Sequence, residues 1–148
     1  MADQDALERR PLESVSGERL RVASAADAEH YNWGARSDGW HLVRSAGLSV
    51  IEESMPPGES EVRHFHHQAR QFFYVLAGCA TIECDGHDYA LLPHHGLEIP
   101  PAMPHQVFNR DAETLRLLVI SQPPSHGDRI AAPQEPQSSV ILKELEFE

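Results

Sequence analysis

The sequence is poor in basic residues and contains no long apolar run. Lysine and arginine together number 12 against 23 aspartates and glutamates, which gives a formal net charge of −11 with histidine neutral. Nucleic acids and anionic membranes are themselves negatively charged, so a surface this acidic disfavours both as partners. Arg116 interrupts the apolar residues 115–120, and no segment approaches the roughly 20 apolar residues of a membrane-spanning helix. The net charge says nothing about a small-molecule substrate, because a local pocket can carry the opposite sign.

Cysteine is also scarce, since only Cys79 and Cys84 are present. On one extended strand, at about 3.4 Å per residue, they would lie about 17 Å apart. A disulfide joins Cα atoms about 4.4–6.8 Å apart. We expect two free thiols in a reducing cytosol, with a paired-cysteine metal site as the alternative. Residues 1–11 are charged and lack the apolar segment of a secretory signal, which also favours a cytoplasmic location.

What the sequence does contain is a series of short apolar segments. The 148 residues fit a single domain, and 41% of them are hydrophobic. From Trp40 onward, segments rich in Val, Ile, Leu, Phe and Tyr alternate with turn residues, and Asp85-Gly86 is a strong hairpin signal. The pattern predicts an all-β fold, an antiparallel sandwich or barrel. The predicted strands are 40–44, 48–54, 62–66, 71–77, 80–84, 87–91, 97–99, 105–109 and 115–121.

The ends of the chain have a different composition from this central part. We expect a flexible arm and lead-in over residues 1–38, the β-barrel over 39–122, and a loop, linker and tail over 123–148. Ser24 and Asp27 could cap a brief helix that reaches Glu29, with a loop as the alternative. Residues 141–148 alternate in a way that could add a strand to a sheet edge of this subunit or of a partner.

Histidine is the most informative residue type, because seven of the ten histidines lie in the segment from His64 to His105. On a strand, His64 and His66 point to one face and Phe65 to the other, so the two imidazoles could share a metal ion. Exposed or hydrogen-bonded histidines are the alternative. Gln71 opens the next predicted strand, and His105 begins a later one. Three neutral imidazoles and one oxygen suit a divalent transition metal such as Zn, Ni, Fe, Mn or Cu.

This arrangement resembles the two sequence motifs of the cupin superfamily. With the family's spacing, the first motif reads Gly58, His64, His66, Gln71 and Gly78. The second reads Pro100, His105 and Asn109. The sequence departs from the pattern in three places: Gln71 stands where the family usually has glutamate, and His94 and Ala102 occupy two glycine positions. Gly96 could make a turn equivalent to one of them.

The resemblance to small single-domain cupins implies a jelly-roll-like barrel of two facing antiparallel sheets. It implies that His64, His66, Gln71 and His105 hold a metal inside the barrel, with no other cofactor. A homodimer is expected from the family resemblance as well. Gly58, Pro100 and Asn109 are expected to shape turns and a loop hydrogen bond instead of taking part in chemistry.

The glutamine changes the chemistry that we expect. Without a carboxylate, all four ligands are neutral and the site keeps a charge near +2, which makes a stronger Lewis acid. Such a ligand set resembles cupin sugar isomerases and the small cupins that linearise unsaturated uronates. Our main hypothesis is therefore an isomerase, lyase or ring-opening enzyme acting on a small polar metabolite. The alternatives are an Fe(II)- or Cu-dependent dioxygenase and a non-enzymatic ligand-binding or sensing protein.

An acid–base step also needs a proton-transferring group near the metal. The sequence offers five candidates without deciding among them: Glu52, Glu98, Tyr89, His95 and Asp128. An anionic substrate could be held by Arg63, Arg70, Arg116 or Gln106. The polar segment 125–129 is either a surface turn, which we favour, or a loop that covers the mouth of the barrel.

Overall fold

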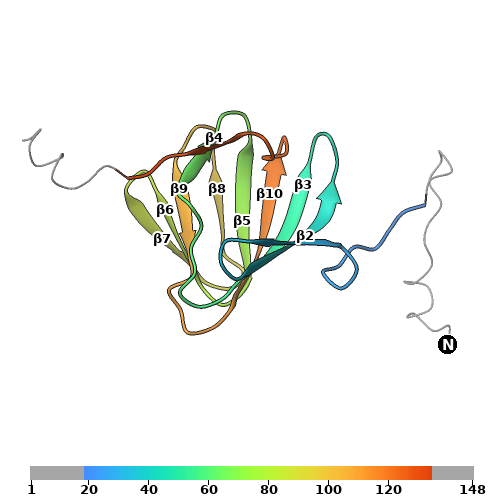
Figure 1. Cartoon of the computed structure of the whole chain (residues 1–148), viewed down its shortest axis with the longest axis horizontal. Coiled ribbons are helices and arrows are strands. Elements are labelled where there is room, and N and C mark those ends of the chain that lie inside the picture. Colours follow the sequence, from blue (N-terminus) through green and yellow to red (C-terminus); the bar gives the residue numbers. More distant parts are fainter. Residues whose placement is uncertain (1–18, 135–148) are drawn as a thin grey trace, which may run out of the picture.

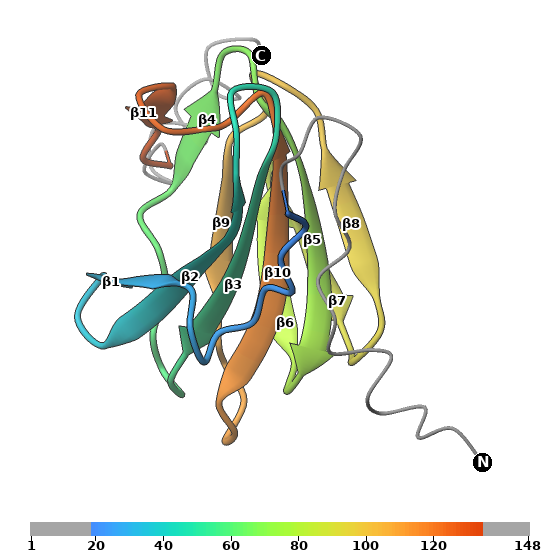
Figure 2. The same cartoon turned by 90° about the vertical axis from the view of Figure 1, so that its right-hand side faces the viewer.

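The structure, a computed structural model, describes residues 19–134 and is entirely β within that range. Two antiparallel sheets face each other (Figures 1 and 2). One has six strands in the order β1-β2-β3-β10-β5-β8, and the other has five in the order β11-β4-β9-β6-β7. The first sheet comprises β1 (Glu29–Trp33), β2 (Ser37–Arg44), β3 (Ser49–Met55), β5 (Arg70–Ala77), β8 (Gly96–Ile99) and β10 (Leu115–Gln122). The second comprises β4 (His64–His66), β6 (Ala80–Cys84), β7 (His87–Leu91), β9 (His105–Phe108) and β11 (Arg129–Ala131).

The core lies between the two sheets and follows from the alternation of side chains along each strand. In β5, Phe73 and Val75 are buried on the inner face, while Phe72 points to the other face and is exposed. In β6 of the opposite sheet, Ile82 is fully buried and contributes to the same apolar cluster. Apolar residues at every second position thus drive the sheets together.

All nine predicted strands are present, each within about three residues of the expected bounds. The all-β prediction is therefore confirmed. The strands also extend beyond residues 39–122, because β1 lies before this range and β11 after it. Neither carries an apolar alternation: β1 is half-exposed, and all three residues of β11 are exposed. The predicted tail strand at 141–148 lies outside the described residues.

In the lead-in, where the sequence predicted either a brief helix or a loop, the structure has a turn. The amides of Asp27 and Ala28 both donate to the carbonyl of Ser24, and the Asp27 carboxylate accepts from the Ser24 amide. The chain then enters β1 at Glu29, so this turn leads directly into the six-stranded sheet. No helix among residues 19–134 is long and apolar enough to cross a membrane.

Two positions where the cupin pattern has glycine keep the glycine-like backbone. His94 has φ = 68° and Ala102 has φ = 66°, both in the left-handed region that glycine adopts most easily. His94 therefore makes the turn by itself. The suggestion that Gly96 makes an equivalent turn is wrong, because Gly96 lies in β8 with the Phe72 ring above it, where a Cβ would be 2.3 Å from the ring. Cys79 and Cys84 are free thiols, as expected.

Gly78 gives a test of these backbone requirements. Its φ is +76°, and an added Cβ would lie 2.7 Å from the carbonyl oxygen of Thr114, a main-chain atom that cannot move aside cheaply. We expect Gly78→Ala to lower the free energy of unfolding by about 1–3 kcal/mol. Gly47→Ala is the matched control, since nothing lies within 4 Å of its added Cβ. Urea unfolding of both variants measures the difference, and equal midpoints would contradict the argument.

Candidate metal centre

The centre begins with the short strand β4. Its alternation buries His64 and His66, each only 4% exposed, on the inner side, while Phe65 faces outward. In the pairing of β4 with β9, His64 lies directly opposite His105, which is 1% exposed. The sheet register therefore brings together three imidazoles that are separated by up to 41 positions in the sequence.

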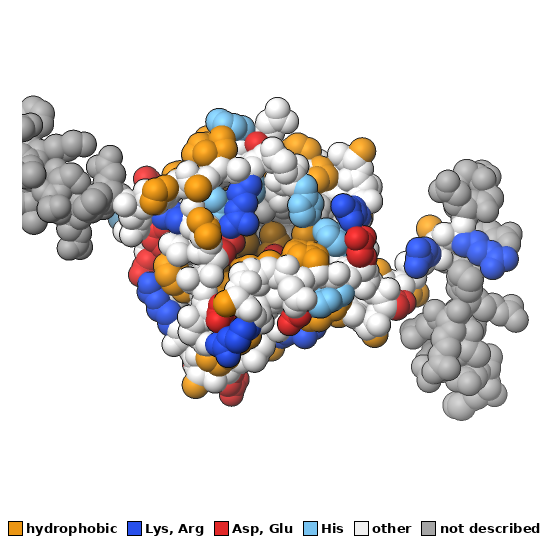
Figure 3. Space-filling view, in the orientation of Figure 1, with side chains coloured by type: hydrophobic (Ala, Val, Ile, Leu, Met, Phe, Trp, Pro, Cys, Tyr) orange, Lys and Arg blue, Asp and Glu red, His pale blue; other side chains and the backbone are white. Residues whose placement is uncertain are grey.

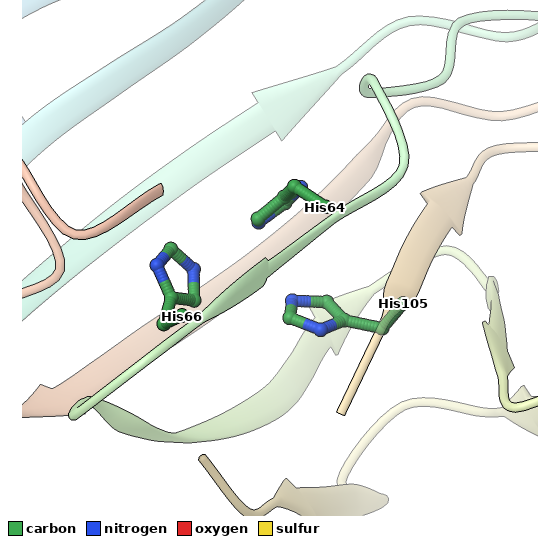
Figure 4. Close-up of side chains that lie close together, drawn as sticks. All are labelled: His64, His66 and His105. Atoms are coloured by element: carbon green, nitrogen blue, oxygen red, sulfur yellow. The ribbon is translucent and has the colours of Figure 1, made fainter. Parts of the chain in front are cut away.

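The three rings point toward one another (Figure 4). The ring of His64 is centred 4.8 Å from that of His66 and 4.5 Å from that of His105. One nitrogen from each ring can be chosen so that all three nitrogens lie within 4.8 Å of one another. These three histidines are therefore close enough to bind one metal ion together.

Each imidazole is oriented by a hydrogen bond from Nδ1 to a main-chain carbonyl. The acceptors are the carbonyl oxygens of Val62 for His64 at 2.7 Å, Asp128 for His66 at 2.8 Å and Met103 for His105 at 2.9 Å. A carbonyl can only accept, so Nδ1 carries the proton in each ring. Nε2 is then left with a lone pair, which is the form that binds a metal.

Gln71 completes the group from the opposite sheet. It is 5% exposed on β5, and its Nε2 donates to Ser121 Oγ at 3.0 Å on the neighbouring strand β10. Five buried side-chain atoms have no hydrogen-bond partner among the described residues, and three of the five belong to this group: Gln71 Oε1, His66 Nε2 and His105 Nε2. Buried polar atoms are rarely left without a partner. A divalent cation would satisfy all three, so the residues present fit a metal.

Burial keeps the histidines neutral. It lowers the pKa of His64 to about 3 and that of His105 to about 4, and it also lowers the pKa of His66. Repulsion between the imidazoles acts in the same direction, since a proton on one ring disfavours a proton on the next. The ring nitrogens therefore remain available to a metal at neutral pH without first losing a proton.

A cavity of about 230 Å³ opens beside the histidines and is lined by His64, His66 and Gln71. Much of its remaining wall is aromatic or aliphatic: Tyr31, Trp33, Ile51, Phe73 and Val119. Its polar wall consists of Glu53, Glu61, Ser125, His126 and Arg129, with Gly127. Figure 3 shows a hollow in the face drawn, with hydrophobic, histidine and arginine side chains around it. The cavity joins the candidate metal-binding atoms to a space for a small molecule.

Two carboxyl groups in this cavity were missed by the sequence analysis. Burial raises the pKa of Glu53 to about 7, and burial together with the nearby Glu53 raises the pKa of Glu61 to about 8. Arg129 opposes both shifts. The cavity thus holds two carboxyls that exchange protons near neutral pH, which is what acid–base catalysis requires.

Two acidic candidates from the sequence lie elsewhere. Glu52 neighbours Glu53 on β3 but points outward, where it forms an ion pair with Arg116. Glu98 is an exposed side chain paired with Arg70. Both carboxylates are therefore poorly placed for proton transfer at the metal.

Tyr89 and His95 are also outside the wall of the cavity. Tyr89 is 44% exposed on β7. His95 lies in the turn before β8, where its Nδ1 accepts the Leu92 amide at 3.2 Å. Neither side chain is placed to transfer a proton beside the histidine cluster.

The arginines proposed for an anionic substrate are engaged outside the cavity as well. Arg63 forms a buried pair with Glu83 at 2.8 Å, while Arg70 and Arg116 pair with the glutamates described above. Gln106 donates to the carbonyl of Glu61. The basic residue of the cavity is instead Arg129, which no apolar pattern marks.

Segment 125–129 contains an exposed turn, as we favoured, and it also contributes to the wall of the cavity. Ser125, His126 and Gly127 line the cavity at its mouth, and Arg129 follows them in β11. Asp128 does not line the cavity, so it is not placed as a proton-transferring group. Its carboxylate accepts backbone N–H bonds from the turn after β4, which lower its pKa.

Comparisons with known proteins agree with this fold. A family model described as "Cupin domain" matches residues 51–121, which include all four candidate metal-binding residues. "Polyketide synthase CurC" of Streptomyces cyaneus is 33% identical over 72 residues, which cover 49% of this chain and 44% of that protein. The chain thus spans less than half the length of this relative.

Solved structures share the fold. KdgF from a Halomonas species superposes with a TM-score of 0.66 at 14% identity, over 72% of this chain and 98% of that one. A sugar phosphate isomerase of the cupin superfamily from Silicibacter pomeroyi superposes with a TM-score of 0.62 at 18% identity, over 69% of this chain and 75% of that one. At such identities the likeness shows the fold alone.

The metal centre can be tested by removing one ligand at a time. We expect His66→Ala and His105→Ala each to lose bound metal while keeping a β-sheet circular dichroism spectrum, since each removes one of three imidazoles. Elemental analysis of untagged protein measures the metal content. His87→Ala is the control, because His87 is exposed on β7. Full occupancy in either ligand variant would contradict the assignment.

The raised pKa of Glu61 predicts that the stability of the metal-free protein depends on pH. Its pKa of about 8 in the folded state exceeds the ordinary value of 4.5, so the folded state binds the proton more tightly. The contribution of Glu61 to the free energy of unfolding therefore decreases as pH rises from about 4.5 to about 8, by at most about 1.4 kcal/mol per pH unit.

We expect Glu61→Gln to reduce this slope between pH 6.5 and 8, where Glu53 supplies part of the slope that remains and the histidines contribute equally to both proteins. Glu52→Gln, the outward-facing control, should keep the wild-type slope. Chemical unfolding at four pH values within the range measures both variants. An unchanged slope in Glu61→Gln would show that its carboxyl is not held in its protonated form.

Proposed function

We propose that this barrel, whose residues 51–121 match the cupin family model, is the metal-dependent catalytic centre of an enzyme that moves a proton beside a carbonyl group of a small metabolite. The observation that carries this proposal is the meeting of two features in one cavity. Neutral metal-binding atoms converge on one side of the cavity, and two carboxyls of raised pKa stand in its wall. Isomerases, lyases and ring-opening enzymes share this requirement.

The proposed ligands are His64, His66 and His105 through Nε2, and Gln71 through Oε1. A bound Zn, Ni, Fe, Mn or Cu ion would supply Lewis acidity, which polarises a carbonyl or hydroxyl oxygen of the substrate. All four ligand atoms are neutral, so they leave the full positive charge of the site to stabilise an enolate or alkoxide oxygen.

The proposed proton transfers belong to Glu53 and Glu61. Glu53, with a pKa of about 7, is largely ionised just above neutral pH and can take a proton from the carbon beside the carbonyl. Glu61 has the higher pKa of the two in the metal-free protein, so it is the better proton donor to the substrate. In an isomerisation the two transfers balance, because one proton leaves the substrate and one returns.

The size of the cavity favours a small substrate. Its volume of about 230 Å³ lies below the ~300–1,000 Å³ of pockets for drug-sized ligands. A molecule the size of a monosaccharide or uronate fits that limit, and its hydroxyls can reach the polar wall. The fold shared with a sugar phosphate isomerase supports this substrate class as a starting point for screening.

A second substrate class is favoured by the apolar wall and by the sequence relative. Tyr31, Trp33 and Phe73 offer ring surfaces on which an apolar chain or an aromatic ring can pack. The relative at 33% identity is named a polyketide synthase. The carbonyls of a polyketide chain are separated by acidic C–H groups, so the same proton transfer would apply to them. Only one end or one ring of such a chain fits in the cavity.

Proton exchange with solvent tests the proposal even when the product of the reaction is unidentified. Metal-loaded protein in D₂O is incubated with ketoses, unsaturated uronates or β-diketones, and NMR follows deuterium entering the carbon beside the carbonyl. We expect Glu53→Gln and Glu61→Gln to slow this exchange by about 10²–10⁴-fold with unchanged metal content. Glu52→Gln should exchange at the wild-type rate.

Two other results would overturn the proposal. Oxygen uptake by the iron-loaded protein, with a β-diketone or phenol, would establish the dioxygenase alternative. Tight binding of small carboxylates without exchange or turnover of any of these substrates would establish the ligand-binding alternative.

A further inference from the structure

Asp128 has an unusual set of contacts at the mouth of the barrel. Its carboxylate accepts three consecutive backbone N–H groups, from His67 at 2.9 Å, Gln68 at 2.9 Å and Ala69 at 3.0 Å. These three residues form the turn between β4 and β5. His66 ends β4 immediately before the turn, and Gln71 follows soon after it. One carboxylate therefore fixes the turn that separates two proposed metal ligands.

The main chain of Asp128 contacts the first of those ligands directly. Its carbonyl oxygen accepts the Nδ1 proton of His66 at 2.8 Å. The residue that follows, Arg129, pairs with His66 in the register of β11 with β4. Asp128, 62 residues further along the chain, thus holds His66 in two ways. Its carbonyl oxygen binds the ring, and its carboxylate binds the turn that follows His66.

The residues before Asp128 face the cavity. Ser125, His126 and Gly127 line it, and the Asp128 amide closes a turn by donating to the Ser125 carbonyl at 3.1 Å. A molecule bound in the cavity therefore touches the segment whose last residue anchors His66. The same residue joins the wall of the cavity to the metal centre.

We infer that Asp128 is a positioning residue that holds His66 and Gln71 in the geometry for metal binding, and that it links segment 125–128 to the metal centre. This inference rests on the proposed metal site. Substituting asparagine removes the negative charge and one of the two acceptor oxygens, so the three N–H groups can no longer all be satisfied. The turn then loosens, and both ligands lose their fixed position.

The test compares Asp128→Asn with the wild type, using Zn²⁺ and Co²⁺ alone as probes. We expect Zn²⁺ affinity, measured by competition with a chromophoric chelator, to fall about 10–100-fold, as for other partners that orient metal ligands. The visible absorption of the Co²⁺ protein should also change, since it reports ligand geometry. Asp111→Asn is the matched control: its carboxylate also accepts a backbone N–H, from Ala112, in a loop outside the cavity wall.

A merely structural role would lower the melting temperature but leave the affinity of the folded protein and the Co²⁺ spectrum unchanged, and that result would overturn the inference. If the wild type binds neither ion, the proposed metal site fails instead. Hydrogen exchange in the wild type gives a second test that needs no variant. We expect Zn²⁺ to slow exchange at the amides of residues 67–69, and equal rates with and without Zn²⁺ would contradict the coupling.

Discussion

The candidate metal centre depends on three hydrogen bonds from imidazole Nδ1–H groups to main-chain carbonyls. Each bond fixes both the orientation and the protonation state of a ring, so that Nε2 of His64, His66 and His105 presents a lone pair to a common point. The accepting carbonyls of Val62, Met103 and Asp128 lie one or two residues before β4, β9 and β11. The main chain therefore orients the three imidazoles, while the Ser121 side chain holds Gln71.

The chemistry that we propose follows from where charge is absent and where it is present. The four ligand positions are neutral, and burial keeps the histidines so. The carboxyls stand apart from them, as Glu53 and Glu61 in the wall of the cavity. A carboxylate that binds a metal weakens its Lewis acidity, whereas one held at a distance can move protons. Separating these two roles suits proton transfer beside a carbonyl.

Much of this could be predicted from the sequence, because the signals are local. Strand alternation predicted the β fold and the shared face of His64 and His66, and the resemblance to the two cupin motifs predicted that His105 joins them inside a barrel. Glu53 could have been found by the same rule, since it lies two residues from the inward-facing Ile51 on one strand. Arg129 could not, because it reaches the cavity only through the pairing of β11 with the distant β4. The same distant pairing hid the contact between Asp128 and His66.

The central claim is that Nε2 of three histidines and Oε1 of Gln71 bind one divalent metal. A crystal structure of the metal-loaded protein, with anomalous scattering recorded at the absorption edge of the metal, tests it most directly. The account predicts one anomalous peak at about 2.0–2.2 Å from all four atoms. A peak elsewhere, or a metal at the histidines with the Gln71 oxygen turned away from it, would contradict the account.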